Sequence, residues 1–224
     1  MLKHRGDRFM LEKSFRSGLL VALMLCLTSL SDAHAIGLNA LGGVSMTNTS
    51  TVNIASSDPI FRGTLGVDVD FEIASLFSLE AGLYYQNRGW SRNRALMTQQ
   101  GLTSSYESAD YLTVPVLVRF AAIPGILKIG LGPYFSYALG NFFSSSTTTT
   151  GQINSSLQSF IDANRNKLDF GGLVSVRGSL PVLPLVDVLA DLRFQYSFTN
   201  LNTNPNLVTR YYDLIFMVGA RIGF

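Results

Sequence analysis

The C-terminal stretch YYDLIFMVGARIGF (residues 211–224) decides the fold, because its side chains alternate between two faces. Leu214 and Phe216 lie on one face, whereas Asp213 and Arg221 lie on the other. Strict alternation is the period of a β-strand whose two sides meet different surroundings. The stretch therefore predicts a strand with one apolar and one polar face.

The same alternation recurs in earlier segments and gives eight predicted strands in all. Each segment has about 11 to 14 residues, which suits a tilted strand that needs ~9 to 11 residues to cross the hydrocarbon of a membrane. The eight segments are 36–46, 62–73, 77–88, 109–120, 127–139, 168–180, 186–198 and 211–224.

The connections between these segments alternate in length. They hold about 15, 3, 20, 6, 28, 5 and 12 residues. Outer-membrane barrels with an even number of strands have short periplasmic turns and long external loops. A soluble lipocalin-like barrel also alternates apolar and polar residues, but nothing obliges its loops to follow this rhythm. The pattern predicts an all-β, eight-stranded antiparallel up-and-down transmembrane β-barrel over residues 36–224.

A candidate secretory signal precedes the strands. Residues 1–35 hold five Lys/Arg, an apolar run from Gly18 to Leu30 and the ending Ala33-His34-Ala35. This charged, apolar and small-residue order is typical of a signal peptide cleaved after Ala35. The apolar run is short for a helix that needs ~20 residues to span the hydrocarbon, and a retained membrane anchor is the alternative.

Removal of residues 1–35 would leave a neutral domain. The leader takes five of the 17 basic and three of the 15 acidic residues, so twelve of each remain. A nucleic-acid partner has no support from that balance. Cys26, His4 and His34 all lie in the leader and are the chain's only cysteine and histidines. Thiolate nucleophiles, Ser-His triads and the usual zinc sites are therefore excluded from the remainder, and we expect no cofactor.

The overall composition favours a membrane barrel without a lipid anchor. Charged residues are 14% of the chain, against ~25% in typical soluble domains. No apolar run long enough for a spanning helix follows Leu30, which leaves the closed barrel as the membrane option. Cys26 follows Leu25 instead of the small residue that a lipoprotein signal requires, so we expect no acylation.

Strand charges fall almost entirely on the face opposite the apolar one. If the apolar faces meet lipid, the barrel interior holds acids and bases that can pair, as buried charges require. The predicted interior acids are Asp68, Asp70, Glu72, Glu80, Asp169, Asp187, Asp191 and Asp213. The predicted interior bases are Arg88, Arg119, Lys128, Arg177, Arg193 and Arg221.

These charges are interpreted as an ion-pair ladder that fixes strand register. Paired carboxylates such as Asp187 and Asp191 could instead act as a general acid and base. An eight-stranded barrel is just wide enough for its own side chains to fill, however, so no room for a substrate is expected.

The segment NRGWSRNR (residues 87–94) is a candidate contact for lipid head groups. It places Arg88, Arg92 and Arg94 around Trp90 at the expected external rim. Guanidinium groups suit phosphate, so lipopolysaccharide is the expected partner there. Salt bridges between loops are the alternative use of these arginines.

Two motifs resemble those of a known family. YLTVPVLV (residues 111–118) and GLGPYF (residues 130–135) resemble the Tyr-Leu-x-x-Pro strand and the following Gly-x-Gly-Pro-Tyr strand of the PorT-like outer-membrane β-barrel family. The resemblance implies a bacterial outer-membrane location, and some members are implicated in secretion machinery. We expect Pro115 and Pro133 to mark β-bulges in adjacent strands, because proline lacks a ladder donor.

The chain also resembles outer-membrane proteins generally in its end. Phe224 follows alternating apolar residues, and the resemblance implies that the barrel-assembly machinery recognises this tail. The expected function is a non-enzymatic structural or interaction protein that meets an unidentified protein partner through loops 47–61, 89–108, 140–167 and 199–210. The alternatives are a small-solute channel and a lipid-modifying enzyme, the latter disfavoured because known small barrel enzymes rely on a histidine.

The leader gives the first prediction. Mass spectrometry of the protein extracted from membranes is expected to find Ile36 at the N-terminus, because the cleavage site follows Ala35. A protein that still carries Met1 to Ala35 would contradict the signal-peptide interpretation.

Overall fold

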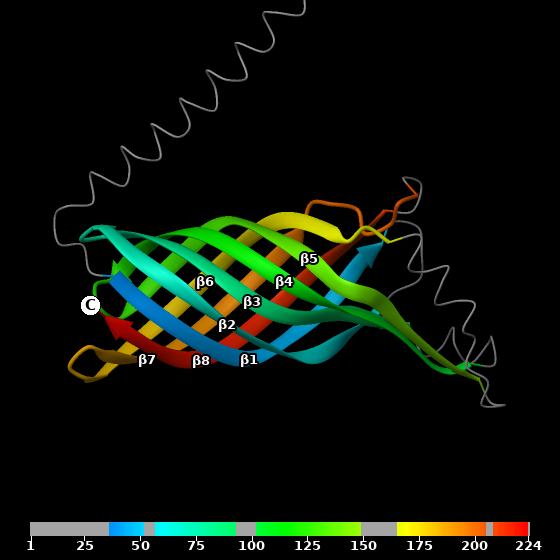
Figure 1. The fold of residues 1–224 in the computed structure, drawn as a ribbon, viewed down its shortest axis with the longest axis horizontal. Helices are drawn as coiled ribbons and strands as arrows, with labels where there is room; N and C mark the ends of the chain where they lie inside the picture. The colour runs from blue at the N-terminus through cyan, green and yellow to red at the C-terminus, as the bar shows by residue number, and fades with distance from the viewer. Residues whose placement is uncertain (1–35, 52–56, 93–101, 149–164, 205–207, 224) are drawn as a thin grey trace, which may run out of the picture. The chain divides into compact units, whose positions relative to one another are not determined.

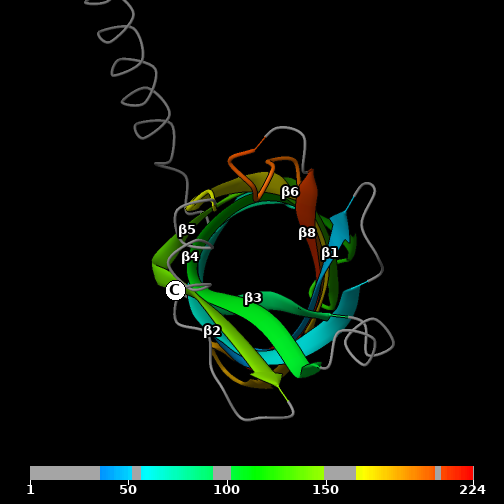
Figure 2. The ribbon, with the colours of Figure 1, turned by 90° about the vertical axis from the view of Figure 1, so that its right-hand side faces the viewer.

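The computed structural model describes residues 36–51, 57–92, 102–148, 165–204 and 208–223. The proposed signal peptide and Phe224 lie outside the described residues. Eight strands form one closed antiparallel barrel, each paired with the next in sequence and the last paired with the first (Figures 1 and 2). The strands are β1 (Ile36–Thr51), β2 (Ser57–Ala74), β3 (Phe77–Arg92), β4 (Leu102–Ile123), β5 (Leu127–Thr148), β6 (Leu168–Leu183), β7 (Val186–Ser197) and β8 (Thr209–Gly223).

The short connections β2–β3, β4–β5 and β6–β7 lie at the same end of the barrel as the end of β8 (Figure 1). Gly125, between β4 and β5, has a φ of 76°, a value that glycine adopts at no steric cost. Leu185, between β6 and β7, has a φ of 71° and accepts a hydrogen bond from the Gly223 amide at 2.9 Å. The strand ends that border the long connections lie at the opposite end, so the predicted alternation of short and long connections is confirmed.

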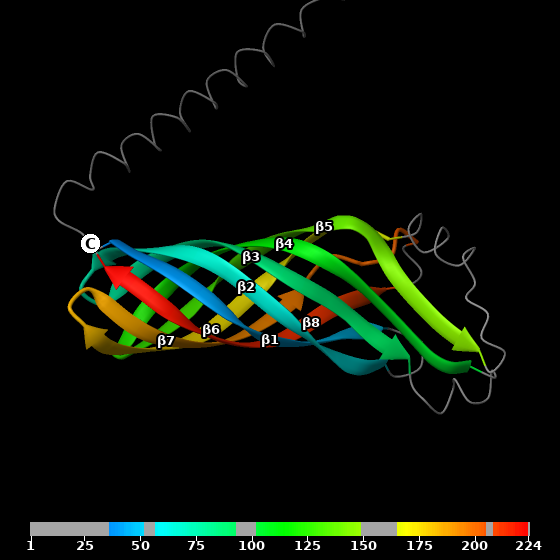
Figure 3. The same cartoon turned by 60° about the horizontal axis from the view of Figure 1, so that its bottom comes forward.

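The strands at the long-connection end extend further than the sequence predicts. β1 continues to Thr51, β4 begins at Leu102, and β5 continues to Thr148. The sequence predicts a loop at the polar residues Ser144–Thr148, but these residues pair with β4. Alternation detects a strand only where its two faces meet different surroundings, whereas backbone pairing continues past that region (Figure 3).

The predicted division of β8 into two faces is confirmed. Phe216 and Val218 are 50% and 53% exposed on the outer surface. Asp213 and Ile215 are 1% and 0% exposed and face the lumen. The outer face is therefore apolar, and the lumen receives both the polar and the remaining bulky side chains.

Inward-facing glycines make room for tyrosine rings in the lumen. A Cβ at Gly66 would lie 2.3 Å from Tyr84 Cδ1, and one at Gly82 would lie 2.6 Å from Tyr84 Cε2. A Cβ at Gly171 would similarly lie 2.5 Å from Tyr134 Cε1. A larger residue at these positions would displace the rings, so the glycines follow from the packing.

The prediction of bulges at the two prolines is wrong. Pro115 pairs with Tyr134, and the β4–β5 register is the same on both sides of Pro133. Register shifts between these strands lie elsewhere, one of them between Ser108 and Asp110. At each proline the strand pairing lacks one backbone N–H donor, yet no extra residue is inserted. The register between β4 and β5 is therefore kept.

A charge placed on the outer face of β8 is expected to destabilise the barrel. Phe216→Arg should lower the free energy of unfolding from lipid vesicles by ~2 to 4 kcal/mol, the cost of Arg near the bilayer midplane. Denaturant titration is the measurement, with Phe216→Leu as the apolar control. Equal stability of the two variants would show that position 216 does not face hydrocarbon.

Candidate functional site in the barrel lumen

A cluster of three arginines and three acids crosses the middle of the lumen. Its acids are contributed by β2, β3 and β7, and its arginines by β4, β6 and β7. Every side chain in it is at most 3% exposed. The cluster consists of Arg119, Arg177, Arg193, Asp68, Glu80 and Asp191, and we call it the central cluster.

The three guanidinium groups share the three carboxylates. Arg177 reaches Asp191 at 2.7 Å, Asp68 at 2.9 Å and Glu80 at 3.0 Å. Arg193 lies 2.9 Å from Asp191 and 3.0 Å from Glu80. Arg119 also bridges Glu80 and Asp191, the latter at 3.2 Å. The cluster is balanced in charge, which is the condition under which buried ions are tolerated.

Neutral side chains complete the hydrogen bonding of this cluster. The Tyr84 hydroxyl donates to Asp68 and accepts from Arg193 Nη2 at 2.7 Å. The Arg193 guanidinium carbon lies 4.3 Å from the centre of the Tyr84 ring, a cation–π distance. Asn39 Nδ2 donates to Asp68. The network thus joins polar groups from opposite walls of the barrel.

A second charged site, centred on Arg88, lies nearer the long-connection end. It is fully buried and lies 2.6 Å from both Asp169 and Asp213. Its guanidinium carbon is 4.5 Å from the ring centre of Tyr211 and 5.3 Å from that of Tyr111. Carboxylates and aromatic faces therefore surround this single charge in a site that water does not reach.

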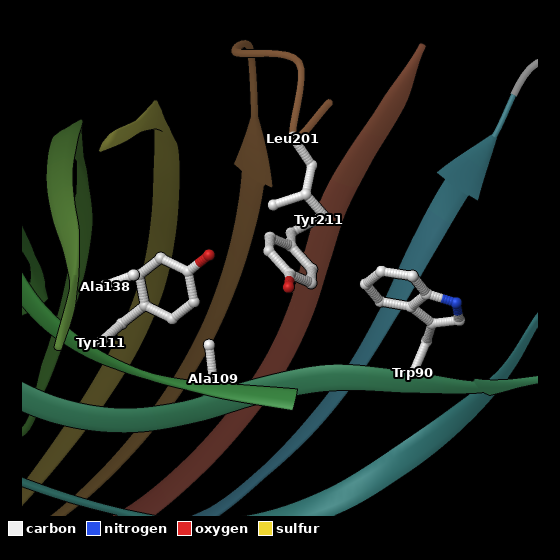
Figure 4. Packing of buried hydrophobic residues seen from close by; sticks show 6 residues of the cluster. All are labelled: Trp90, Ala109, Tyr111, Ala138, Leu201 and Tyr211. Atoms are coloured by element: carbon white, nitrogen blue, oxygen red, sulfur yellow. The ribbon is translucent and has the colours of Figure 1, made fainter. Parts of the chain in front are cut away.

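A cluster of aromatic and small apolar side chains is buried in the lumen (Figure 4). Arg88 lies against the Tyr111 and Tyr211 rings of this cluster. The Tyr211 ring lies 5.9 Å from Tyr111 and 6.1 Å from Trp90, both edge-on. Leu201, from the connection that follows β7, is 5% exposed and packs into the cluster. The Arg165 guanidinium carbon lies 5.0 Å from the centre of the Trp90 ring, a cation–π distance.

The tight-turn end of the lumen is more open. Lys128 binds Asp70 at 2.7 Å and lies 3.5 Å from Glu72. Arg221 lies 3.5 Å from Glu72 and 4.0 Å from Asp187. Glu72 keeps 39% of its side chain exposed, so these pairs are partly hydrated.

All predicted interior charges face the lumen, but the rim assignment is corrected. Arg88 and Trp90, predicted to contact lipid head groups, are 0% and 9% exposed and point inward. β3 continues to Arg92, and its even-numbered residues share one face. Arg88 and Trp90 therefore point inward, as Glu80 and Tyr84 do. The side chain of Arg92, and Arg94 as a whole, lie outside the described residues. That the charges set the register stays a prediction.

Sequence reasoning missed four tyrosines that fill the lumen. Tyr84, Tyr111, Tyr134 and Tyr211 are each at most 1% exposed. The sequence does indicate this position for Tyr211, because it lies two residues before Asp213 and therefore on the same face of the strand. Not every aromatic residue of the strands turns inward, since Phe77 is 47% exposed on the outer surface.

The described residues offer no group of three or more His, Cys, Asp or Glu side chains arranged to hold a metal ion. In the same part of the chain, no helix has the length and apolar character to cross a membrane.

The apolar outer surface, paired interior charges and closed ladder define an integral β-barrel of the outer-membrane type. The chain belongs to the outer membrane protein beta-barrel domain family, whose model matches residues 29–202. The protein is therefore located in the bacterial outer membrane. The family match does not test the finer PorT-like relationship.

One solved structure shares the fold, and a second aligns with a lower TM-score. The outer membrane protein OprG from Pseudomonas aeruginosa aligns with a TM-score of 0.53 at 11% identity, over 86% of this chain and 96% of OprG. A major outer membrane protein from Thermus thermophilus aligns with a TM-score of 0.48 at 14% identity, over 86% of this chain and 100% of the other. The chain matches no curated protein in sequence.

Neutralising one acid of the central cluster is expected to cost much of the barrel's stability. Asp191→Asn leaves three arginines with two acids, and breaking a buried pair typically costs ~3 to 5 kcal/mol. Denaturant titration in vesicles measures the loss. Asp58→Asn, at an exposed site, is the control and should stay within about 0.5 kcal/mol of the wild type.

A double variant separates charge imbalance from packing. Asp191→Asn combined with Arg193→Gln restores the balance, so it should be more stable than Asp191→Asn alone. A single variant no less stable than Asp58→Asn would contradict the paired network.

Proposed function

We propose that this protein is a non-enzymatic outer-membrane barrel with a sealed lumen, acting as a structural or interaction protein through its external loops. The observation that supports the sealed lumen is the central cluster, in which Arg119, Arg177 and Arg193 meet three acids with almost no exposure. A conducting path along the barrel axis would have to separate these pairs.

The surroundings of the cluster make that separation costly. Opposite charges attract strongly where little water screens them. Each acid of the cluster contacts more than one arginine, so displacing one side chain breaks several buried ion pairs at once. Barrels with aqueous channels have ~16 to 18 strands, whereas eight strands leave an interior that side chains fill.

A lipid-modifying enzyme has less support than the sealed barrel. Residues 36–224 contain no histidine and no cysteine, so a histidine-based acyl transfer is not available to them. Asp187 and Asp191, considered as a general acid and base, are engaged by Ser179 at 3.0 Å and by the arginines of the central cluster respectively.

We also propose the finer PorT-like relationship, with its association to secretion or the cell surface. It is supported by the two proline-containing motifs, whose Pro115 and Tyr134 pair directly across β4 and β5. The partner-binding parts are the four external loops, and Phe224 is the signal for barrel assembly. Lipopolysaccharide and other outer-membrane lipids are the surrounding partners.

Planar-bilayer recording tests the sealed lumen. The purified wild-type protein is expected to show no steady conductance above background, with a reconstituted porin as the positive control. Reproducible single-channel steps that change in size or ion selectivity in Arg193→Gln or Asp191→Asn would show that these residues line a pore. That result would overturn the proposal in favour of a solute channel.

A further inference from the structure

A hollow of about 450 Å³ lies at the long-connection end of the barrel. It forms where β5, the start of β6 and the segment after β7 meet. Its lining residues are Tyr137, Asn166, Lys167, Leu168, Thr199 and Asn200. In an outer-membrane barrel this end faces the cell exterior, so the hollow opens at the external rim.

Lys167 brings a positive charge to the hollow that the described residues do not neutralise. Its side chain is exposed, and among the described residues it forms neither a salt bridge nor a side-chain hydrogen bond. Its backbone is anchored, because the Lys167 carbonyl accepts the Ala138 amide at 2.8 Å. The backbone of Lys167 is therefore fixed at the hollow, and no described residue supplies a counter-charge to its ammonium group.

The asparagine and threonine side chains of the hollow are engaged in hydrogen bonds within the protein. Asn166 Nδ2 donates to the Asn200 carbonyl at 2.7 Å, and Asn200 Oδ1 accepts the Thr209 amide at 2.8 Å. The Thr199 hydroxyl donates to the buried Asp169. These bonds hold the two walls together, so the hollow is preformed and its ordering cost on binding is low.

Apolar and aromatic side chains border the hollow on the outer surface. Tyr137 and Leu168 line it and are 49% and 70% exposed. A row of phenylalanine rings continues from β5 to β6 and to the residue after β7. The Phe170 ring centroid lies 4.9 Å from that of Phe135 and 5.8 Å from that of Phe198. Aromatic girdles of this kind mark the level of the lipid head groups.

We propose that this hollow binds the phosphate-bearing head group of an outer-leaflet lipid. The Lys167 ammonium pairs with the phosphate, and Leu168 and Tyr137 contact the first part of the acyl chains. The inference rests on the membrane location and on this geometry, and it does not depend on whether the lumen is sealed. The site differs from the rim around residues 87–94 that the sequence suggested.

Lipid binding to the purified wild-type barrel and its variants, measured by native mass spectrometry, tests the proposal. The probe is bis-phosphorylated lipid A, compared with the same lipid after removal of its phosphates. Lys167→Gln should raise the apparent dissociation constant about fivefold, the effect of one basic residue near an anionic lipid surface. Lys167→Arg should stay near the wild-type value, because it keeps the charge.

Two controls make the test specific. Arg210→Gln removes a cation near the start of β8, at the same end of the barrel but outside the hollow. This variant should leave binding nearly unchanged. The dephosphorylated lipid should bind the wild type and Lys167→Gln equally, and inorganic phosphate should not displace lipid A. Equal losses in Lys167→Gln and Arg210→Gln, or wild-type affinity in Lys167→Gln, would overturn the site. Displacement by free phosphate would overturn the lipid as its ligand.

Discussion

The backbone of this protein must satisfy its own hydrogen bonds, because hydrocarbon offers no partner for a free amide or carbonyl. β1 and β8 meet this requirement by pairing from Gly37 with Gly223 to Thr51 with Thr209. With eight strands, closure also sets the width of the lumen, which side chains then fill. The amino-acid sequence has to supply an apolar outer face and an interior that packs within that width.

The charged interior follows from this constraint. A charge cannot face lipid cheaply, so the acids and bases of the strands turn inward and must find partners there. Glycines at positions such as Gly66 and Gly82 then leave space for the Tyr84 ring, whose hydroxyl joins the network. The same sorting leaves the rim, where no described residue pairs with the cation of Lys167, as the place at which we propose recognition.

The strand count and the lumen-facing charges could be predicted from the sequence, because each depends on a period of two residues. The strand ends at the external side could not, since β4 and β5 continue as a polar ladder without a contrast between faces. Trp90 is misplaced by the sequence for the same reason, because the predicted strand ends at residue 88 whereas β3 continues to Arg92. Arg88 lies inside the predicted strand, and its assignment to the interior is correct. The hollow beside Lys167 depends on hydrogen bonds between distant segments, which no local pattern reveals.

Solid-state NMR of isotope-labelled protein in bilayers measures directly whether paired charges fill the lumen of the closed barrel. The Asp191 carboxyl carbon is expected to show through-space contacts to the guanidinium carbons of Arg119, Arg177 and Arg193, with no magnetisation transfer from water. Transfer from water to this carboxyl carbon, without contacts to the arginines, would contradict the account.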